Sequence, residues 1–388
     1  MSRRRICVYI GGRANYSSSK SILQNIKIHP ALELLVIAGA ASVIDRYGEL
    51  TSVLQEDGFS ADYRFFSLVE GETPLTMAKS AGLGLIEASS ALDNLQPDLV
   101  LVIGDRYDVL PVAIASSFMN IPLAHTMGGE VTGTIDESIR HAITKLAHLH
   151  FPANEDAYQR IIRMGERPES VHNVGCPRND IVLQTLHNQN SREVLAGLYR
   201  AHSGVGPELD LSGRFLLVSQ HPVTTEYGEN VSNMQKTLAA LDRIRLPTLL
   251  LWPNSDAGSG EISRAIRVFR ERHRPEWLHV FKDLPLETYI HLMSTTACLI
   301  GNSSSGVREG ALLGTPVVNI GSRQSTRLRG RNVISVSNED GEIEKAILKQ
   351  LEHGRYEMDT LYGDGRAGVR IAEFLASAIP VVQKGIAY

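Results

Sequence analysis

The sequence predicts an α/β protein built from two doubly wound parallel sheets, and three observations support this fold class. Short apolar segments alternate with helical segments along most of the 388 residues. Some of these segments are apolar at nearly every position, as in strands buried on both faces. The alternation weakens around residues 178–212 and then resumes, which predicts two Rossmann-like domains, 1–180 and 181–388.

The first domain is expected to begin with a strand that ends at a glycine pair, followed by a helix from about Ser18. A long amphipathic helix is expected over Thr73–Leu95. The strands expected in this half are Ile6–Ile10, Leu34–Ile37, Tyr63–Phe66, Asp98–Ile103, Leu123–His125 and Leu149–Phe151.

The second domain is expected to repeat the same alternation after a polar stretch with a Ser-Gly-Val-Gly-Pro loop. For the last helix, residues 367–380, two placements stay open: on the second domain or back on the first. The strands expected in this half are Phe215–Ser219, Thr248–Trp252, Leu278–Phe281, Cys298–Gly301, Pro316–Ile320 and Val333–Val336.

Composition narrows the class of protein. The net charge is −4 without a long run of either sign, which argues against a nucleic-acid scaffold. The three cysteines, Cys7, Cys176 and Cys298, are far apart and predict neither a disulfide framework nor a zinc site. The apolar run after the first arginines is too short for a signal sequence or a membrane span. We therefore expect a cytoplasmic protein that binds neither nucleic acid nor membranes.

The stretch 123–141 is the one around which the chain is organised. It holds three carboxylates (Glu130, Asp136 and Glu137), two histidines and an arginine, and a glycine pair directly precedes Glu130. Glycines allow backbone to approach a ligand closely, and several acids in one cleft suit proton transfer. The alternative is a polar turn in which Asp136 caps the following helix and Glu137 lies near the positive end of its dipole.

Polar clusters follow the strands in both domains. Ligands of such sheets bind beyond the carboxyl ends of the strands, so these clusters predict an active site between the two domains. The clusters are Gly12-Arg13, Gly104-Asp105-Arg106, His125 to Glu130, Gln220-His221-Pro222, Pro253-Asn254-Ser255-Asp256, Gly301 to Gly306 and Gly321-Ser322-Arg323.

The loop Gly301–Gly306 leads into a helix near Val307 and offers backbone N–H groups and serine hydroxyls that suit phosphate. Arg13, Arg323 and Arg327 could neutralise such a group by bidentate contacts. The loop lacks both Gly-Lys-Ser/Thr and GxGxxG, so neither ATP nor NAD is the expected ligand. The alternative is an ordinary serine N-cap.

Six motifs in the same order resemble those of the hydrolysing UDP-N-acetylglucosamine 2-epimerases, which include bacterial sialic-acid enzymes and the epimerase half of the bifunctional animal enzyme. The motifs are Gly12-Arg13-Ala14-Asn15-Tyr16, Gly104-Asp105-Arg106, Gly128 to Lys145, Gln220 to Thr225, Pro253 to Ser259 and Gly301 to Glu309. The resemblance implies a GT-B-like pair of domains with a UDP-sugar in the cleft, and a homodimer or homotetramer.

The resemblance also implies a reaction. A base removes the C2 proton while UDP leaves from C1, and the 2-acetamidoglucal intermediate then takes up water at C1 and a proton at C2. No step requires a metal or a cofactor. Carried over by motif, the catalytic residues are Asp105, Glu130, Glu137 and His221. The substrate-binding residues are Arg13, Asn254, Asp256, Ser303, Ser304, Ser305, Gly306, Glu309 and Arg323. Arg140 and His141 are left between a structural and a substrate-facing role.

Two positions depart from the family pattern near the expected sugar pocket. Asn15 stands where relatives usually carry an acid, and Met127 where many bacterial members carry His. A 2,4-diacetamido-6-deoxy sugar is therefore a second candidate substrate. The sequence is also compatible with a retaining GT-B glycosyltransferase, a catalytically silent nucleotide-sugar sensor or a non-hydrolysing epimerase. Because the sequence ends at Tyr388, any sugar kinase is expected to be a separate protein.

Overall fold

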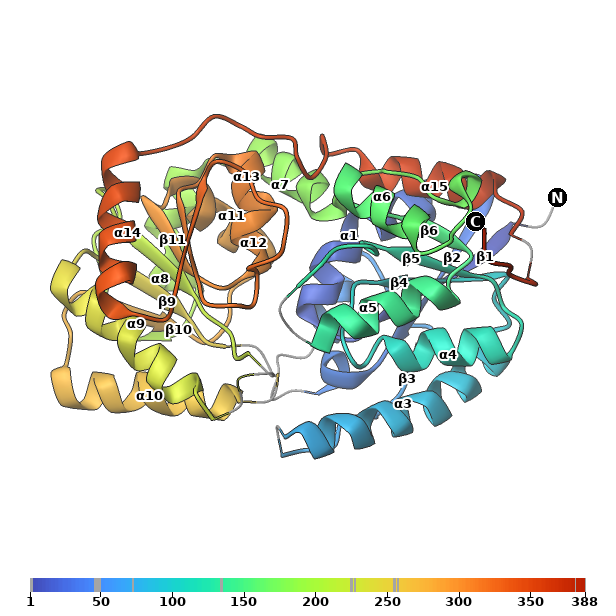
Figure 1. The fold of residues 1–388 in the computed structure, drawn as a ribbon, viewed down its shortest axis with the longest axis horizontal. Helices are drawn as coiled ribbons and strands as arrows, with labels where there is room; N and C mark the ends of the chain where they lie inside the picture. Colours follow the sequence, from blue (N-terminus) through green and yellow to red (C-terminus); the bar gives the residue numbers. More distant parts are fainter. Residues whose placement is uncertain are drawn as a thin grey trace. The chain divides into compact units, whose positions relative to one another are not determined.

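The computed structural model of the chain forms two compact units, each with its own parallel sheet (Figure 1). The structure describes residues 3–44, 50–71, 73–132, 135–223, 226, 228–253, 256, 258–380 and 382–387. The first unit comprises residues up to Val131, Ile135–Ile181 and Gly363–Tyr388, and the second unit is formed mainly by Val182–Tyr362. The predicted α/β class with two doubly wound sheets is confirmed.

The sheet of the first unit has the order β3-β2-β1-β4-β5-β6, and every pair in it is parallel. Adjacent β1 and β4 mark the point at which the strand order reverses, where such sheets bind ligands. The strands are β1 (Arg4–Ile10), β2 (Leu32–Ala38), β3 (Tyr63–Arg64), β4 (Leu99–Ile103), β5 (Leu123–Thr126) and β6 (Leu149–Phe151).

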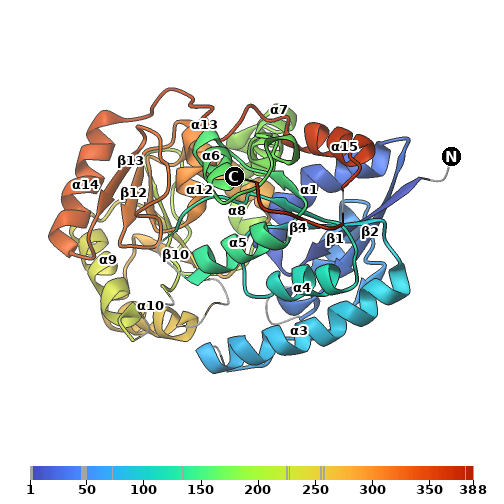
Figure 2. The same ribbon diagram turned by 45° about the vertical axis from the view of Figure 1, so that its right-hand side comes forward.

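Apolar faces of helices cover this sheet on both sides. Side chains of α3, α4 and α5 pack with strand residues such as Cys7, Val100 and Leu123 in one core cluster. Helices α1 and α15 pack against each other (Figure 2). The helices are α1 (Arg13–Ile28), α2 (Leu50–Glu56), α3 (Pro74–Leu95), α4 (Leu110–Phe118), α5 (Ile135–Leu146), α6 (Glu155–Arg163), α7 (Pro177–Asn188) and α15 (Ala367–Ser377), with 3-10 turns at Ala40–Val43 and Pro168–Ser170.

The start of α1 differs from the prediction, because the helix begins at Arg13 and not near Ser18. Serines of the first turns donate their hydroxyls back to the helix: Ser17 to the Arg13 carbonyl (2.8 Å) and Ser19 to that of Asn15 (3.2 Å). Such bonds to the preceding turn let serine sit inside a helix. Arg13 is therefore the first helical residue, directly after β1 and its glycine pair.

The second unit has the order β13-β12-β11-β8-β9-β10-β7. One of its pairs departs from the predicted parallel sheet: β7, in the polar loop, joins the edge of β10 in antiparallel direction. The strands are β7 (Gly204–Val205), β8 (Leu216–Ser219), β9 (Thr248–Leu251), β10 (Leu278–Phe281), β11 (Cys298–Gly301), β12 (Val317–Ile320) and β13 (Val333–Val336).

Two apolar cores lie on the two faces of this sheet. The larger one packs α9, α10 and α14 against residues such as Val218 and Ile300, and the other packs α8 and α11 against Leu217 and Leu299. Alternate strand residues thus serve opposite faces. The helices are α8 (Ser191–Ala201), α9 (Asn230–Ile244), α10 (Ser259–His273), α11 (Leu286–Thr295), α12 (Ser304–Val307), α13 (Glu309–Leu313) and α14 (Asp340–His353).

The C-terminal helix belongs to the first unit by its contacts, which is one of the two placements that the sequence left open. The Asp180 carboxylate accepts from the first two backbone amides of α15, those of Ala367 (3.0 Å) and Gly368 (2.7 Å). The hydroxyl of Ser21 in α1 donates to the same carboxylate (2.5 Å). An acid at a helix N-terminus is favourable, so Asp180 fixes α15 to α1 and α7.

A buried carboxylate, Glu166, holds the residues that follow α15. It accepts from Lys145 (2.6 Å) and His150 (3.1 Å) and forms an ion pair with Lys384 (2.7 Å). Lys384 also donates to the carbonyl of Ala147 (2.5 Å), just beyond the C-terminal end of α5. The final segment is therefore tied to α5, the helix that carries Glu137.

Acid should weaken the first unit through Glu166. Burial alone would raise the pKa of this carboxyl, but the hydrogen bonds from His150, Lys145 and Lys384 outweigh it and lower the pKa from 4.5 to about 2. A depressed pKa in the folded state stabilises the protein above pH 4.5, and this contribution is lost as the pH falls toward 2. Glu166→Gln should therefore cost about 3 kcal/mol at pH 7. Urea unfolding at several pH values should show this deficit shrinking below pH 4.5, and a constant deficit would contradict the assignment.

Candidate functional site

In the first unit, the predicted residues lie at the reversal point of the sheet. Arg13 follows β1, Asp105 follows β4 and Glu130 follows β5. Because these strands are neighbours and parallel, their carboxyl ends meet at one edge. The Glu130 side chain is buried, and that of Asp105 is 23% exposed. The strand order thus brings three of the predicted site residues to one edge of one sheet.

Arg140 of α5 joins the carboxylate of Asp105 to the main chain of Glu130. Its side chain is fully buried, one terminal nitrogen donates to the Glu130 carbonyl (2.7 Å), and the other forms an ion pair with the Asp105 carboxylate. A guanidinium suits this task because its planar fork can serve two acceptors at once. The sequence left Arg140 undecided; the structure places it between Asp105 and Glu130.

Helix α5 also carries the third candidate acid, Glu137, in its first turn. Glu137 lies 3.6 Å from the His141 ring one turn later. Burial lowers the pKa of His141, and the charge of Arg140 adds to this effect while Glu137 opposes it. Asp136 is not the predicted helix cap, because α5 already begins at Ile135 and Asp136 lies inside the first turn. Asp136 and Glu137 are thus consecutive residues of the first turn of α5.

The glycine pair before Glu130 is required by the protein's own packing. A Cβ at Gly129 would lie 2.3 Å from the Ala157 carbonyl oxygen, and its φ of 75° is in the left-handed region. The preceding Met127 is buried and also has a positive φ, 64°. A bulky residue in this conformation is strained, which is typical of functional loops. Gly129 thus lets the chain after β5 turn closely past α6, and the expected close approach of a ligand to the glycines stays a prediction.

In the second unit, two loops are hydrogen-bonded to each other where the strand order of that sheet reverses, between β8 and β11. The His221 amide donates to the side-chain oxygen of Asn302 (2.7 Å), and the Asn302 side chain donates back to the His221 carbonyl (2.8 Å). Arg323 and Gln324 donate to the Asn302 carbonyl (3.4 and 3.1 Å). Asn302 therefore fixes the loop that carries His221. Gln324, whose contact spans distant residues, was not predicted.

The serine loop after β11 is an ordered donor set. Ser303 is the N-cap of α12, its hydroxyl is 2.8 Å from that of Ser305, and Ser305 is 2.7 Å from the Tyr289 hydroxyl. Ser304 and Gly306 lie in the short helix α12, and Glu309, at the start of α13, is buried. The predicted N-cap and the predicted phosphate contacts are thus compatible, because the hydroxyls and the helix N-terminus belong to one loop.

Two further predicted binding residues of the second unit are close to each other. An Arg323 nitrogen lies 3.8 Å from the Asp256 carboxylate, and both side chains are mostly buried. Asn254 lies outside the described residues. The described part of the second unit therefore gathers His221, Asp256, Arg323 and the serine loop around β8, β9, β11 and β12.

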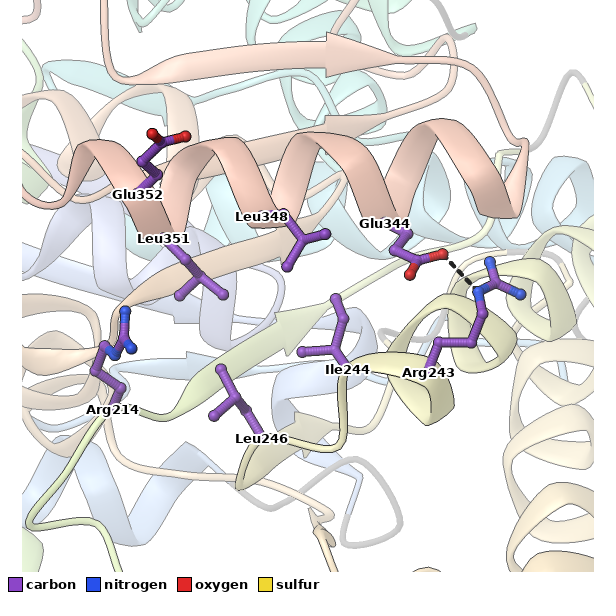
Figure 3. Close-up of a pocket in the computed structure, with 8 residues that line it drawn as sticks. All are labelled: Arg214, Arg243, Ile244, Leu246, Glu344, Leu348, Leu351 and Glu352. Carbon is purple, nitrogen blue, oxygen red and sulfur yellow. Dashed lines mark hydrogen bonds and ion pairs between the residues drawn. The ribbon is translucent and has the colours of Figure 1, made fainter.

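A separate groove of the second unit lies between α9 and α14 (Figure 3). It measures about 470 Å³ and combines apolar side chains with charged ones. An ion pair between Arg243 and Glu344 lies at its rim. The lining residues are Arg214, Arg243, Ile244, Leu246, Glu344, Leu348, Leu351 and Glu352. None of them belongs to the predicted set.

Among the described residues, no three His, Cys, Asp or Glu side chains are grouped as they would be to hold a metal ion. Likewise, none of the described helices combines the length and apolarity that a membrane crossing requires.

Comparison with known proteins identifies similar chains. The family model described as UDP-N-acetylglucosamine 2-epimerase matches residues 24–376. A Legionella pneumophila protein named UDP-N,N'-diacetylbacillosamine 2-epimerase (hydrolyzing) is 32% identical and covers 96% of this chain and 95% of its own. The UDP-N-acetylglucosamine 2-epimerase of Neisseria meningitidis is 29% identical, with 93% and 91% covered. A crystal structure of a Neisseria meningitidis UDP-GlcNAc 2-epimerase bound to UDP-GlcNAc matches with a TM-score of 0.81 at 17% identity, covering 96% of this chain and 100% of that one. This last likeness supports the two-domain GT-B-like fold.

Proposed function

Because this chain belongs to the UDP-N-acetylglucosamine 2-epimerase family, we propose that it is a hydrolysing 2-epimerase that converts UDP-N-acetylglucosamine and water into N-acetylmannosamine and UDP. The observation that carries the proposal is the link that Arg140 makes between Asp105 and Glu130. The guanidinium pairs with the Asp105 carboxylate and bonds the main-chain carbonyl of Glu130, so it positions both candidate acids for proton transfer.

The proposed reaction has two stages. First, a carboxylate of the set Asp105, Glu130 and Glu137 removes the C2 proton, and the C1–O bond breaks with departure of UDP. Water then adds to C1 of the glucal, and a proton returns to C2 from the opposite face. Opposite faces require at least two proton carriers, which the three acids supply.

The residues of the second unit are proposed to bind UDP. The serine loop, residues 303–306, would donate to the diphosphate, with Arg323 and Arg13 neutralising its charge. Glu309 would hold the ribose. Asp256 and Asn254 are the remaining residues proposed to bind the substrate. His221, whose loop Asn302 fixes, would assist departure of UDP or protonation.

A second substrate is favoured by two observations. The Legionella relative, 32% identical, is named for a UDP-N,N'-diacetylbacillosamine, a 2,4-diacetamido sugar. Asn15 and the strained Met127 also depart from the family pattern. The same chemistry at C1 and C2 applies to this sugar, so only the pocket around the C4 and C6 substituents would differ.

NMR in deuterated water tests the proposal. With UDP-N-acetylglucosamine we expect free N-acetylmannosamine, deuterated at C2, together with one UDP per sugar. A product still attached to UDP would indicate a non-hydrolysing epimerase, and a product without C2 deuterium a glycosyltransferase. Turnover of the UDP-2,4-diacetamido sugar alone would identify the second substrate. Binding of both sugars without turnover would refute the proposed activity.

A further inference from the structure

The carbonyls directly before Asp105 are both held by buried side chains. The Ile103 carbonyl, at the end of β4, accepts from the Asn15 amide (2.9 Å). The Gly104 carbonyl accepts from Nε2 of His125 (2.8 Å), while the Gly104 amide donates to the Thr126 carbonyl (3.0 Å). The backbone that leads into Asp105 is thus fixed on both sides.

The hydrogen bonds of His125 define its tautomer. A carbonyl oxygen can only accept, so Nε2 carries the proton; Nδ1 then accepts from the Thr144 hydroxyl at 3.1 Å. Burial lowers the pKa of this ring to about 3, so it is neutral near pH 7. Its side chain is fully buried, which excludes contact with a substrate.

The surrounding backbone is shaped to keep this hydrogen-bonded chain. Gly104 has a φ of 81°, which glycine adopts without strain. A Cβ at Gly128 would lie 2.8 Å from Nδ1 of His125 and 2.9 Å from the Thr144 hydroxyl. A side chain at Gly128 would therefore disturb the bond between His125 and Thr144.

The two partners of His125 belong to the candidate acid–base set. Gly104 precedes Asp105, and Thr144 lies on α5 one turn after Arg140, which pairs with Asp105 and contacts Glu130. The Asp105 loop is thus tied to α5 at two levels, through Arg140 and through His125. Two contacts one helical turn apart fix the orientation of the Asp105 loop against α5 as well as its distance from that helix.

We propose that His125 is a positioning residue that holds the Asp105 loop against α5 through Gly104 and Thr144. This inference rests on the proposed function, in which Asp105 acts at the sugar. His125 transfers no proton; it fixes where the Asp105 carboxylate lies. A displacement of about 1 Å at a reacting group can cost roughly a hundredfold in rate.

Four variants test this role. His125→Phe keeps the ring shape without its nitrogens, His125→Gln restores a donor for the Gly104 carbonyl, and Thr144→Val removes only the second bond. The matched control is His279→Phe in the second unit, where a buried histidine ring bonds the Pro207 carbonyl (2.8 Å). We expect His125→Phe to lower kcat about 30- to 100-fold with KM within about threefold. His125→Gln should recover most of that loss, Thr144→Val should lose less, and His279→Phe should keep kcat within about twofold.

A pH profile separates positioning from proton transfer. Because His125 stays neutral, His125→Gln should keep both limbs of the kcat/KM profile at the wild-type pH values. Loss or displacement of a limb in this variant would overturn the proposal, as would a kcat of His125→Phe equal to that of the control.

Hydrogen exchange gives a readout that does not depend on activity. The peptide covering residues 99–108 should exchange faster in His125→Phe and be unchanged in His279→Phe. If wild type turned over neither UDP-sugar, the proposed function would fail, while faster exchange would still support the tie. Unchanged exchange in that peptide would refute it.

Discussion

Replacing Glu130 by Gln should lower kcat about a thousandfold, the range expected for loss of a general acid or base. The change removes the ionisable oxygen but keeps the size of the buried side chain. The hydrogen bond from Arg140 to the main-chain carbonyl of this residue is also kept. Apart from Arg13, the residues proposed to bind UDP lie in the second unit, so UDP affinity should stay within about threefold. Steady-state kinetics and calorimetric titration with UDP check both expectations.

The control for this variant is Glu166→Gln, which makes the same chemical change at an equally buried glutamate of the same unit. At a temperature where it is folded, it should keep kcat within about twofold. Wild-type turnover by Glu130→Gln would show that Glu130 does not take part in proton transfer. The parallel variants Asp136→Asn and Glu137→Gln then show which acid of the first turn of α5 takes part.

Arg140→Met should both destabilise the first unit and abolish turnover. The substitution leaves Asp105 without the guanidinium, and breaking a buried ion pair from one side costs about 3 kcal/mol. It also removes the donor to the Glu130 carbonyl. Arg140→Lys should recover part of the stability but little activity, because an ammonium cannot reproduce the fork.

Urea unfolding can assign the loss to the correct unit. Both tryptophans, Trp252 and Trp277, lie in the second unit, so their fluorescence reports on that unit, while far-UV circular dichroism reports on both. The unfolding midpoint of the variant should therefore shift further to lower urea when it is followed by circular dichroism than when it is followed by fluorescence. The double variant Arg140→Met/Asp105→Asn should be less destabilised than the sum of its single changes. Additive losses would show that the pair is not coupled.

Much of the fold could be predicted because the strands lie in the sheet interiors. Segments such as Leu99–Ile103 are buried on both faces and therefore apolar at every position. Helix starts were less predictable: α1 begins at Arg13, earlier than expected, and the serine hydroxyls of its first turns bond the preceding turn. Strand β7 was missed because two exposed residues carry no apolar pattern.

The candidate site was predictable to the extent that its residues follow strands. Arg13, Asp105, Glu130 and His221 each follow the end of a strand, and within each sheet the parallel strand order determines that such residues lie at one edge. The roles of Arg140 and His125 were not predictable, because nothing local distinguishes a buried structural side chain from one facing a ligand. Each of their partners lies at least 10 residues away in the sequence.

The sequence by itself determined the α/β class, the two sheets and the strand-end residues, because periodicity and glycine positions are local properties of the chain. Tertiary structure alone decided which of these residues are tied together. Arg140 reaches Asp105 and Glu130, His125 connects Gly104 with Thr144, and Asp180 returns α15 to the first unit. Each of these contacts exists only after distant segments have packed, since burial selects the partners of a charged or polar group.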